Sequence, residues 1–84
     1  MTLPQTILRR AGVLMFGSDW APRMADALDV NLRSVQRWTS GAQPIPTGVW
    51  GELASLADAR GRMLAALTAE LVARAVAADS VEGG

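Results

Sequence analysis

The chain has 84 residues, which is enough for one small domain and too few for two. Half of the residues are hydrophobic and 19% are charged, a composition typical of folded globular proteins. Eight basic residues, all Arg, balance eight acidic ones, and His, Cys, Lys and Tyr are absent. These absences exclude a Ser–His or Cys–His nucleophile, a Schiff-base lysine, a zinc site and a disulfide. We therefore expect a protein that is not an enzyme, with no metal, no cofactor and no evident small-molecule ligand.

The charges are unevenly distributed along the chain. Residues 1–51 hold five Arg and three Asp, whereas residues 52–84 hold three Arg and five acidic residues. A polyanion responds to the face that it meets, so the first half is the candidate binding half. The N-terminus lacks the pattern of a signal peptide and no 18-residue stretch is free of charge, so we expect a cytoplasmic protein with no membrane segment.

The first predicted helix begins near Thr2, which can cap it together with Gln5, and ends at Gly17. Pro4 fits the first turn, where its missing N–H has no cost. Apolar residues recur at helical spacing and predict the face toward the core. They are Ile7, Leu8, Ala11, Leu14 and Met15.

A second, short helix is predicted to begin after a cap at Ser18 or Asp19 and to end near Leu28. Its buried face consists of Met24, Ala25 and Leu28. After a short turn, Asn31 is a good cap for a third helix that ends at Gly41. In this helix, Leu32, Val35 and Trp38 are expected to point inward.

Residues 41–47 contain two prolines and are expected to form an extended connector. Thr47 can cap a further helical pattern that continues to about Ala78, with Gly61 as the expected place of a bend or a break. The sequence therefore predicts an all-α fold of four to five helices with a long apolar C-terminal helix. We expect a helix-turn-helix core at residues 1–47, a helix or helix pair at 48–79 and a frayed tail at 80–84.

The segment from Arg23 to Gly41 has the spacing of a helix-turn-helix motif. Ala25 is small where the next helix crosses, and Val35 and Trp38 reach back into the core. The turn position, which requires a positive φ and is usually Gly, is Asp29; Asp is one of the few other residues that tolerate this conformation.

At these residues the chain resembles the lambda-repressor and Cro-like family of phage and bacterial regulators. The resemblance covers roughly residues 5–56 and is strongest over residues 20–41, which end in Arg-Trp-Thr-Ser-Gly. It implies a transcription regulator that binds double-stranded DNA as a homodimer, with the helix at about residues 31–40 in the major groove.

The resemblance implies that Leu32, Arg33 and Arg37 read bases, and that neighbouring positions reach phosphates or nearby bases. Those neighbouring positions are Asn31, Ser34, Gln36 and Ser40. The chemistry of the residues agrees, because an Arg fork can bind guanine and Gln can pair with adenine. The alternative is that the Arg and Gln residues form only a solvated helix face. Arg9, Arg10 and Arg23 are further candidates for phosphate contacts.

Two other groups of residues invite a functional interpretation. Trp20, Trp38 and Trp50 could stack on bases, but Trp38 lies on the apolar stripe, which favours a role in the core. Asp26 and Asp29 lie three residues apart without another acid, His or metal ligand nearby, which indicates surface and turn positions rather than acid–base chemistry.

The pattern from Gly61 to Ala78 is apolar over more than half of the helix circumference, which favours self-association over packing on the chain's own domain alone. A membrane-surface helix would need a basic polar face, which this segment lacks. The expected dimerisation residues are Met63, Leu64, Leu67, Leu71, Val72 and Ala75. The sequence thus leaves two functions open. One is a homodimeric DNA-binding regulator, and the other is a protein-interaction module of the same fold that uses this helix.

Overall fold

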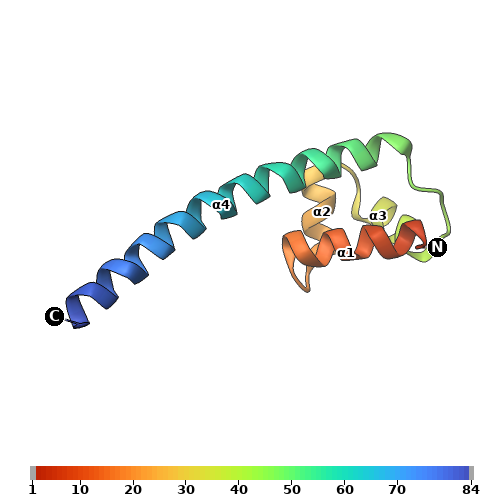
Figure 1. Cartoon of the computed structure of the whole chain (residues 1–84). Coiled ribbons are helices and arrows are strands. Elements are labelled where there is room, and N and C mark those ends of the chain that lie inside the picture. The colour runs from red at the N-terminus through yellow and green to blue at the C-terminus, as the bar shows by residue number, and fades with distance from the viewer. Residues whose placement is uncertain (1, 84) are drawn as a thin grey trace.

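The computed structural model describes the backbone of residues 2–83 and the side chains of residues 2–78. Within this part, the chain forms four helices and no strand: α1 (Pro4–Phe16), α2 (Trp20–Leu28), α3 (Leu32–Ser40) and α4 (Thr47–Gly83). Helices α1, α2 and α3 form a small cluster, and α4 crosses this cluster and continues well beyond it (Figure 1). The molecule is therefore elongated, with extents of 61 × 27 × 19 Å. The all-α prediction is confirmed.

One apolar core lies where the four helices meet. The most deeply buried side chains are those of Leu8, Met24 and Val35, none of which is exposed to solvent. The remaining core residues come from α2, α3 and the first turns of α4. They are Ala25, Leu28, Trp38, Val49 and Leu53. The predicted inward faces of the second and third helices are thus confirmed, apart from Leu32.

A buried glycine allows α1 and α2 to approach closely. Gly12 lies in the middle of α1, and the ring of Trp20 lies directly against it. A Cβ atom built on Gly12 would overlap Cε3 and Cδ2 of Trp20, closer than non-bonded carbon atoms can approach. The glycine therefore creates the space that the indole ring of Trp20 occupies.

The turn between α2 and α3 depends on a left-handed residue. Asp29 has φ 55° and ψ 48°, as the sequence predicts. The N–H of Val30 donates to the carbonyl of Ala25 at 2.9 Å, and the N–H of Asp29 donates to that of Asp26 at 3.2 Å. These two bonds form a Schellman motif, which satisfies the last carbonyls of α2 and turns the chain toward α3.

Both ends of α3 agree with the predictions. The side chain of Asn31 accepts a hydrogen bond from the backbone N–H of Arg33 at 2.9 Å, which caps the helix. At the other end, Gly41 has φ 84° and ψ 4°, and its N–H donates to the carbonyl of Trp38. Connector residues 41–46 then lead to α4.

The sequence left open whether residues 48–79 form one helix or a helix pair, and α4 is one helix that continues through Gly61. It differs from the prediction at its ends, because it begins at Thr47 rather than after a cap there and extends past Ala78 to Gly83. A single glycine costs about 1 kcal/mol in a helix interior, which the Ala-rich and Leu-rich neighbours offset. The predicted tail at residues 80–84 falls on residues whose side chains lie outside the described part.

Several predictions for α1 and α3 were wrong. The residue that caps α1 is Leu3, without a side-chain hydrogen bond, so Thr2 is not the cap. Leu14 is 78% exposed, and Ile7 and Leu32 are each 37% exposed, so none of the three belongs to the core. Leu8 lies one turn before Gly12, on the face of α1 that packs against Trp20 and the core, whereas Ile7 and Leu14 line a groove beside α4.

The α2 cap also lacks the expected side-chain bond. Asp19 occupies the cap position of α2, but no side-chain hydrogen bond caps the helix there.

Of the three tryptophans, Trp38 is buried, and Trp20 and Trp50 are partly buried and pack against the core. Among the described residues, no helix combines the length and apolarity required to cross a membrane.

Candidate nucleic-acid interface

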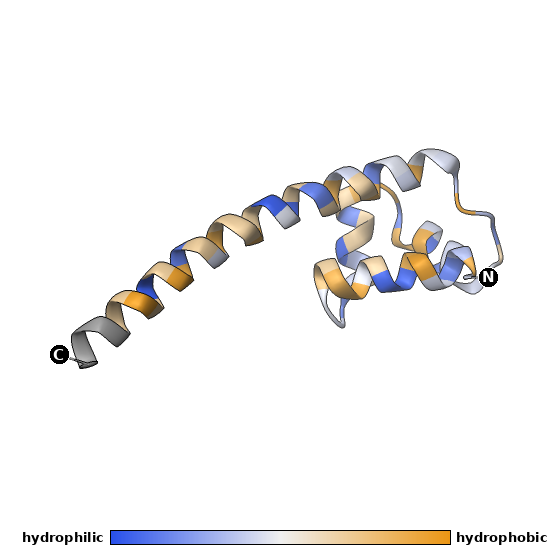
Figure 2. Ribbon diagram, in the orientation of Figure 1, coloured by the Kyte–Doolittle hydropathy of each residue, from blue (hydrophilic) through white to orange (hydrophobic). Residues whose placement is uncertain are grey.

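Helix α3 has two sharply different faces. Val35 and Trp38 lie on the buried face, whereas Arg33, Gln36 and Arg37 are exposed on the opposite one. Residues three and four positions apart in a helix are surface neighbours, so these three side chains form one polar patch. The hydropathy colouring shows apolar and polar residues interleaved along the helices of the cluster (Figure 2). We call Arg33, Gln36, Arg37 and Ser40 the polar face of α3.

The two guanidinium groups of this face have no partner in the described part of the chain. The one ion pair there joins Arg62 to Asp58 on α4, and neither Arg33 nor Arg37 donates a side-chain hydrogen bond. Exposed guanidinium groups without an internal partner keep all five N–H donors free for a ligand. Such forks match the paired acceptors of guanine and the oxygens of phosphate.

The other candidate residues of α3 are placed less uniformly. The side-chain oxygen of Asn31 is used as the helix cap, which leaves its amide NH₂ free. Ser40 donates to the carbonyl of Arg37 at 3.2 Å and accepts from the N–H of Ala42 at 3.3 Å, so its hydroxyl stabilises the end of α3. Ser34 is half-buried. The polar face therefore depends mainly on Arg33, Gln36 and Arg37.

Leu32 is partly exposed rather than buried, which bears on its expected role. The side chain of Leu32 was expected both in the core and, from the resemblance, as a base-reading residue, and these two expectations exclude each other. With 37% of its surface exposed at the start of α3, it is open to an apolar contact from outside. The sequence pattern could not distinguish the two positions, because Leu32 lies next to the buried stripe of a nine-residue helix.

Arg9, Arg10 and Arg23 are exposed on α1 and α2, where they remain candidates for phosphate contacts. One neighbour was missed by the sequence reasoning. The amide nitrogen of Gln5 lies 3.3 Å from where a Cβ of Gly41 would be, so the start of α1 lies beside the end of α3. Gln5 therefore adds a polar side chain beside the end of α3, and no local sequence signal predicts this proximity.

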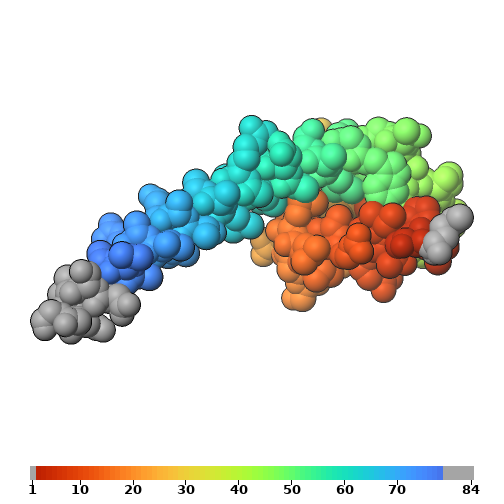
Figure 3. Space-filling view, in the orientation of Figure 1, coloured from red at the N-terminus to blue at the C-terminus, as the bar shows by residue number. Residues whose placement is uncertain are grey.

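The candidate dimerisation residues form a second surface, on α4. Beyond the helical cluster α4 projects alone, as the space-filling view shows (Figure 3). Five of the six expected dimerisation residues are large apolar side chains, and each is between 46% and 69% exposed. They are Met63, Leu64, Leu67, Leu71 and Val72, and Ala75 is exposed as well.

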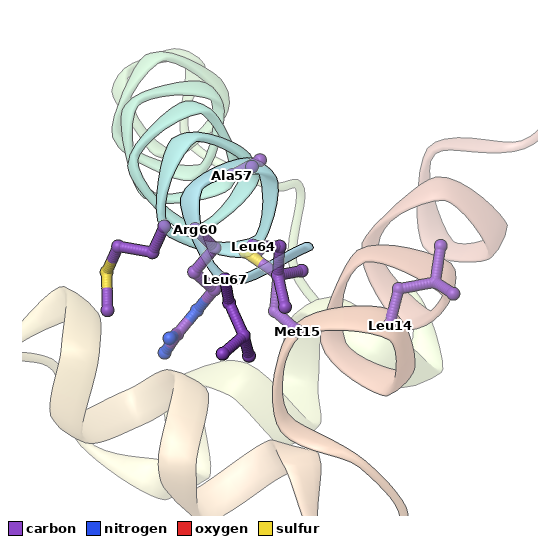
Figure 4. Close-up of a pocket in the computed structure, with 8 residues that line it drawn as sticks. Leu14, Met15, Ala57, Arg60, Leu64 and Leu67 are labelled. Carbon is purple, nitrogen blue, oxygen red and sulfur yellow. The ribbon is translucent and has the colours of Figure 1, made fainter. Parts of the chain in front are cut away.

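A groove between α1 and α4 joins this surface to the helical cluster. Leu14 and Met15 of α1 line one side, and Ala57, Leu64 and Leu67 of α4 line the other, around a cavity of about 630 Å³ (Figure 4). At its inner end the guanidinium of Arg60 lies 4.7 Å from the ring centre of Phe16, a cation–π contact that attaches α4 to the end of α1. The groove is open to solvent and mostly apolar.

Among the residues whose side chains are described, no three His, Cys, Asp or Glu side chains come together as a metal site.

Comparison with known proteins finds no family model, no curated protein and no solved structure that matches this chain. We therefore infer the function from the geometry of α3 and α4.

Proposed function

We propose that this chain is a homodimeric transcription regulator that binds double-stranded DNA in a sequence-specific manner. The observation that carries the proposal is the pairing of a left-handed turn at Asp29 with a capped helix α3 whose polar face holds two unpaired Arg side chains. In this proposal α2, the turn and α3 form a helix-turn-helix, and α3 enters the major groove.

The polar face of α3 has the size and the chemistry that major-groove reading requires. Arg33 and Arg37 lie one helical turn apart, and each can donate two hydrogen bonds to O6 and N7 of a guanine. Gln36, between them on the same face, can pair with the N6 and N7 atoms of adenine. Leu32 can contact the methyl group of a thymine. The buried Val35 and Trp38 hold α3 in place, so its orientation need not change when DNA binds.

Charge neutrality of the whole chain does not oppose this proposal. DNA meets one face of a protein, and α3 contains two Arg and no acidic residue. Exposed Arg residues on α1 and α2 can add phosphate contacts, which position a protein on the duplex without reading sequence. Because one small module makes few contacts, binding two half-sites as a dimer raises the affinity through effective concentration.

Selection of bound sequences from a random duplex pool tests this proposal directly. We expect enrichment of one motif, and a binding constant that falls steeply with salt as counterions are released. The double variant Arg33→Ala with Arg37→Ala should enrich no motif. Arg62→Ala is the matched control, because Arg62 is an exposed Arg on α4, away from α3, and should enrich the same motif as the wild type. A pool without any enriched motif for the wild-type protein would contradict the proposal.

The second candidate is a protein-interaction module of the same fold. The exposed apolar side chains of α4 and the balanced net charge favour it, because a partner protein could cover these side chains. The same selection experiment separates the two functions. A chain that only binds another protein would give no sequence-dependent gel shift at any salt concentration.

A further inference from the structure

Helix α4 has an apolar stripe that its own domain does not cover. Six residues on it alternate in spacing between four and three positions, which is the seam pattern of a coiled coil. We call them the outer stripe: Ala57, Gly61, Leu64, Thr68, Leu71 and Ala75. All six are exposed, whereas Val49 and Leu53, which pack on the core nearer the start of the helix, are buried.

The six residues of the outer stripe include no charged side chain. Asp58, Arg62 and Glu70 lie about 100° or more around the helix from its centre line. Arg60 lies nearer, about 60° from the centre line, but its guanidinium packs over the ring of Phe16. The hydroxyl of Thr68 already donates to the carbonyl of Leu64 at 2.7 Å, so the one polar group of the stripe is satisfied within its own helix.

The first half of the outer stripe borders a groove formed with α1. Ile7, Ala11 and Leu14 line this groove opposite Ala54 and Ala57, around about 290 Å³ of open space. It continues into the larger cavity at Gly61 and Leu64, where Figure 4 shows Leu14 and Ala57 on the two sides. The alanines and the glycine make the floor shallow enough for another helix to approach closely.

Gly61 leaves room for a second helix to approach the outer stripe closely. A Cβ on Gly61 would meet nothing within 4 Å, so the space beside it is open. At Gly12 the corresponding space holds the ring of Trp20. Gly61 is thus the smallest residue of the outer stripe and the place where a large side chain of a partner helix fits best.

The outer stripe is complementary to itself when its direction is reversed. We infer that a second copy of the chain places its α4 antiparallel in the α1–α4 groove, with the two-fold axis crossing the stripe at the level of residue 66. Residues equally far from position 66 then meet across the pair, so Leu71 of one copy faces Gly61 of the other and Leu64 faces Thr68. Ala57 faces Ala75 in the same register. Every large side chain of the stripe thus meets a smaller residue.

The size of this contact suits a stable dimer. With Ala54 and Ala78 as its ends, the paired stripe is about 36 Å long at 1.5 Å per residue. A helix is about 10 to 12 Å wide, and α1 adds a second strip of similar width along half of the paired length. Together these strips give a projected contact area on the order of 600 Å² per copy. Standard interfaces bury about 800 Å² per partner, so the two areas are comparable. Leu67 and Val72 flank the stripe and enlarge the apolar area.

This inference rests on the proposed function, because that function already includes a homodimer. The register also sets the distance between the two helical clusters, which matters for binding DNA. The core residues of α4 centre on Leu53, 13 residues from position 66. Two such spans amount to about 39 Å along the helix pair, near the roughly 34 Å between successive major grooves. The clusters lie at opposite ends of the pair.

Cysteine crosslinking tests the inference without DNA, and the chain contains no other cysteine. In the double variant Ala57→Cys with Ala75→Cys, the thiol at position 57 of one copy should face the thiol at position 75 of the other. We expect mild oxidation to convert most of this variant into covalent dimers on a non-reducing gel. The two sites lie about 27 Å apart within one helix, so no disulfide can form within a chain.

Three controls distinguish this arrangement from others. Either single variant alone should give little covalent dimer, because the proposed register places its two copies about 27 Å apart. Efficient crosslinking of a single variant would indicate a parallel pair or a two-fold axis at the substituted residue, and either result would overturn the inference. Ala57→Cys with Thr68→Cys should crosslink weakly, and stronger crosslinking than in the 57/75 pair would show a different register. Sedimentation of the wild-type protein as a monomer at micromolar concentration would exclude the dimer altogether.

The outcome is separate from that of DNA binding. Crosslinking in the proposed register without any enriched DNA motif would reject the proposed function and leave the antiparallel dimer in place. An enriched DNA motif together with crosslinking of the single variants would reject only the antiparallel register.

Discussion

Substituting Gly12 with alanine should destabilise the protein, although alanine is the better helix former. A Cβ at this position would overlap two atoms of the Trp20 ring and lie 2.9 Å from a third, and the ring is wedged between α1 and the core. Overpacking of this kind costs about 1 to 3 kcal/mol. Against it stands the gain of about 0.5 to 1 kcal/mol that alanine brings to a helix interior.

Gly51→Ala is the matched control, because a Cβ at Gly51 meets nothing within 4 Å and the residue is also inside a helix. Since both variants share the propensity gain, the difference between their free energies of unfolding isolates the overpacking, about 1 to 3 kcal/mol. Each kcal/mol shifts Tm by about 4 to 8 °C in a domain of this size. Thermal unfolding at one fixed protein concentration measures the difference. If Gly12→Ala were as stable as Gly51→Ala or more stable, the packing argument would be refuted.

Three further predictions concern α3 and the turn before it. Arg33→Ala or Arg37→Ala should each weaken binding to the selected DNA site by about 1 to 3 kcal/mol and relax the preference at one base pair, as a gel shift with single-base variants of the site would reveal. Asp29→Gly should raise the free energy of unfolding by up to about 1 kcal/mol, and Asp29→Val should lower it by about 1 to 2 kcal/mol, because φ is 55° at this position; the opposite order in denaturant titrations would contradict the role of the turn. Trp38→Ala should unfold the domain almost completely, since loss of a buried Trp costs about 3 to 5 kcal/mol; a folded variant by circular dichroism that has lost only DNA affinity would assign the ring to stacking instead.

Local chemistry made most of the first 41 residues predictable. The ends of α2 and α3 follow from residues that act within one turn of the chain, namely Asp29, Asn31 and Gly41. Their roles depend on backbone conformation and short-range hydrogen bonds, which do not require knowledge of the distant packing. The polar face of α3 was predictable for the same reason, because it is the complement of the buried Val35 and Trp38.

The parts that failed depend on how helices pack. The apolar period of α1 includes both Leu8 and Leu14, and which of them points inward depends on how α1 packs against the other helices, including the contact of Gly12 with Trp20. Gly12 was the available signal, since a glycine inside a predicted helix indicates close approach of another group. The sequence left open whether the C-terminal helix breaks at Gly61, and the structure shows one continuous helix, because a penalty of about 1 kcal/mol does not by itself break a long helix of good helix formers.

The proposed DNA-binding and dimer surfaces lie on helices that do not touch along their backbones. Among the described residues, α1 and α2 approach α4, but α3 does not. A change on the outer stripe should therefore alter how two copies are joined while each α3 keeps its buried anchors, Val35 and Trp38. Conversely, loss of Arg33 should leave the association of the two copies unchanged. If the two surfaces act in this way, a stripe variant such as Leu71→Glu lowers DNA affinity without altering the preferred bases, because the affinity of paired half-sites depends on the link between them and base preference on α3 alone.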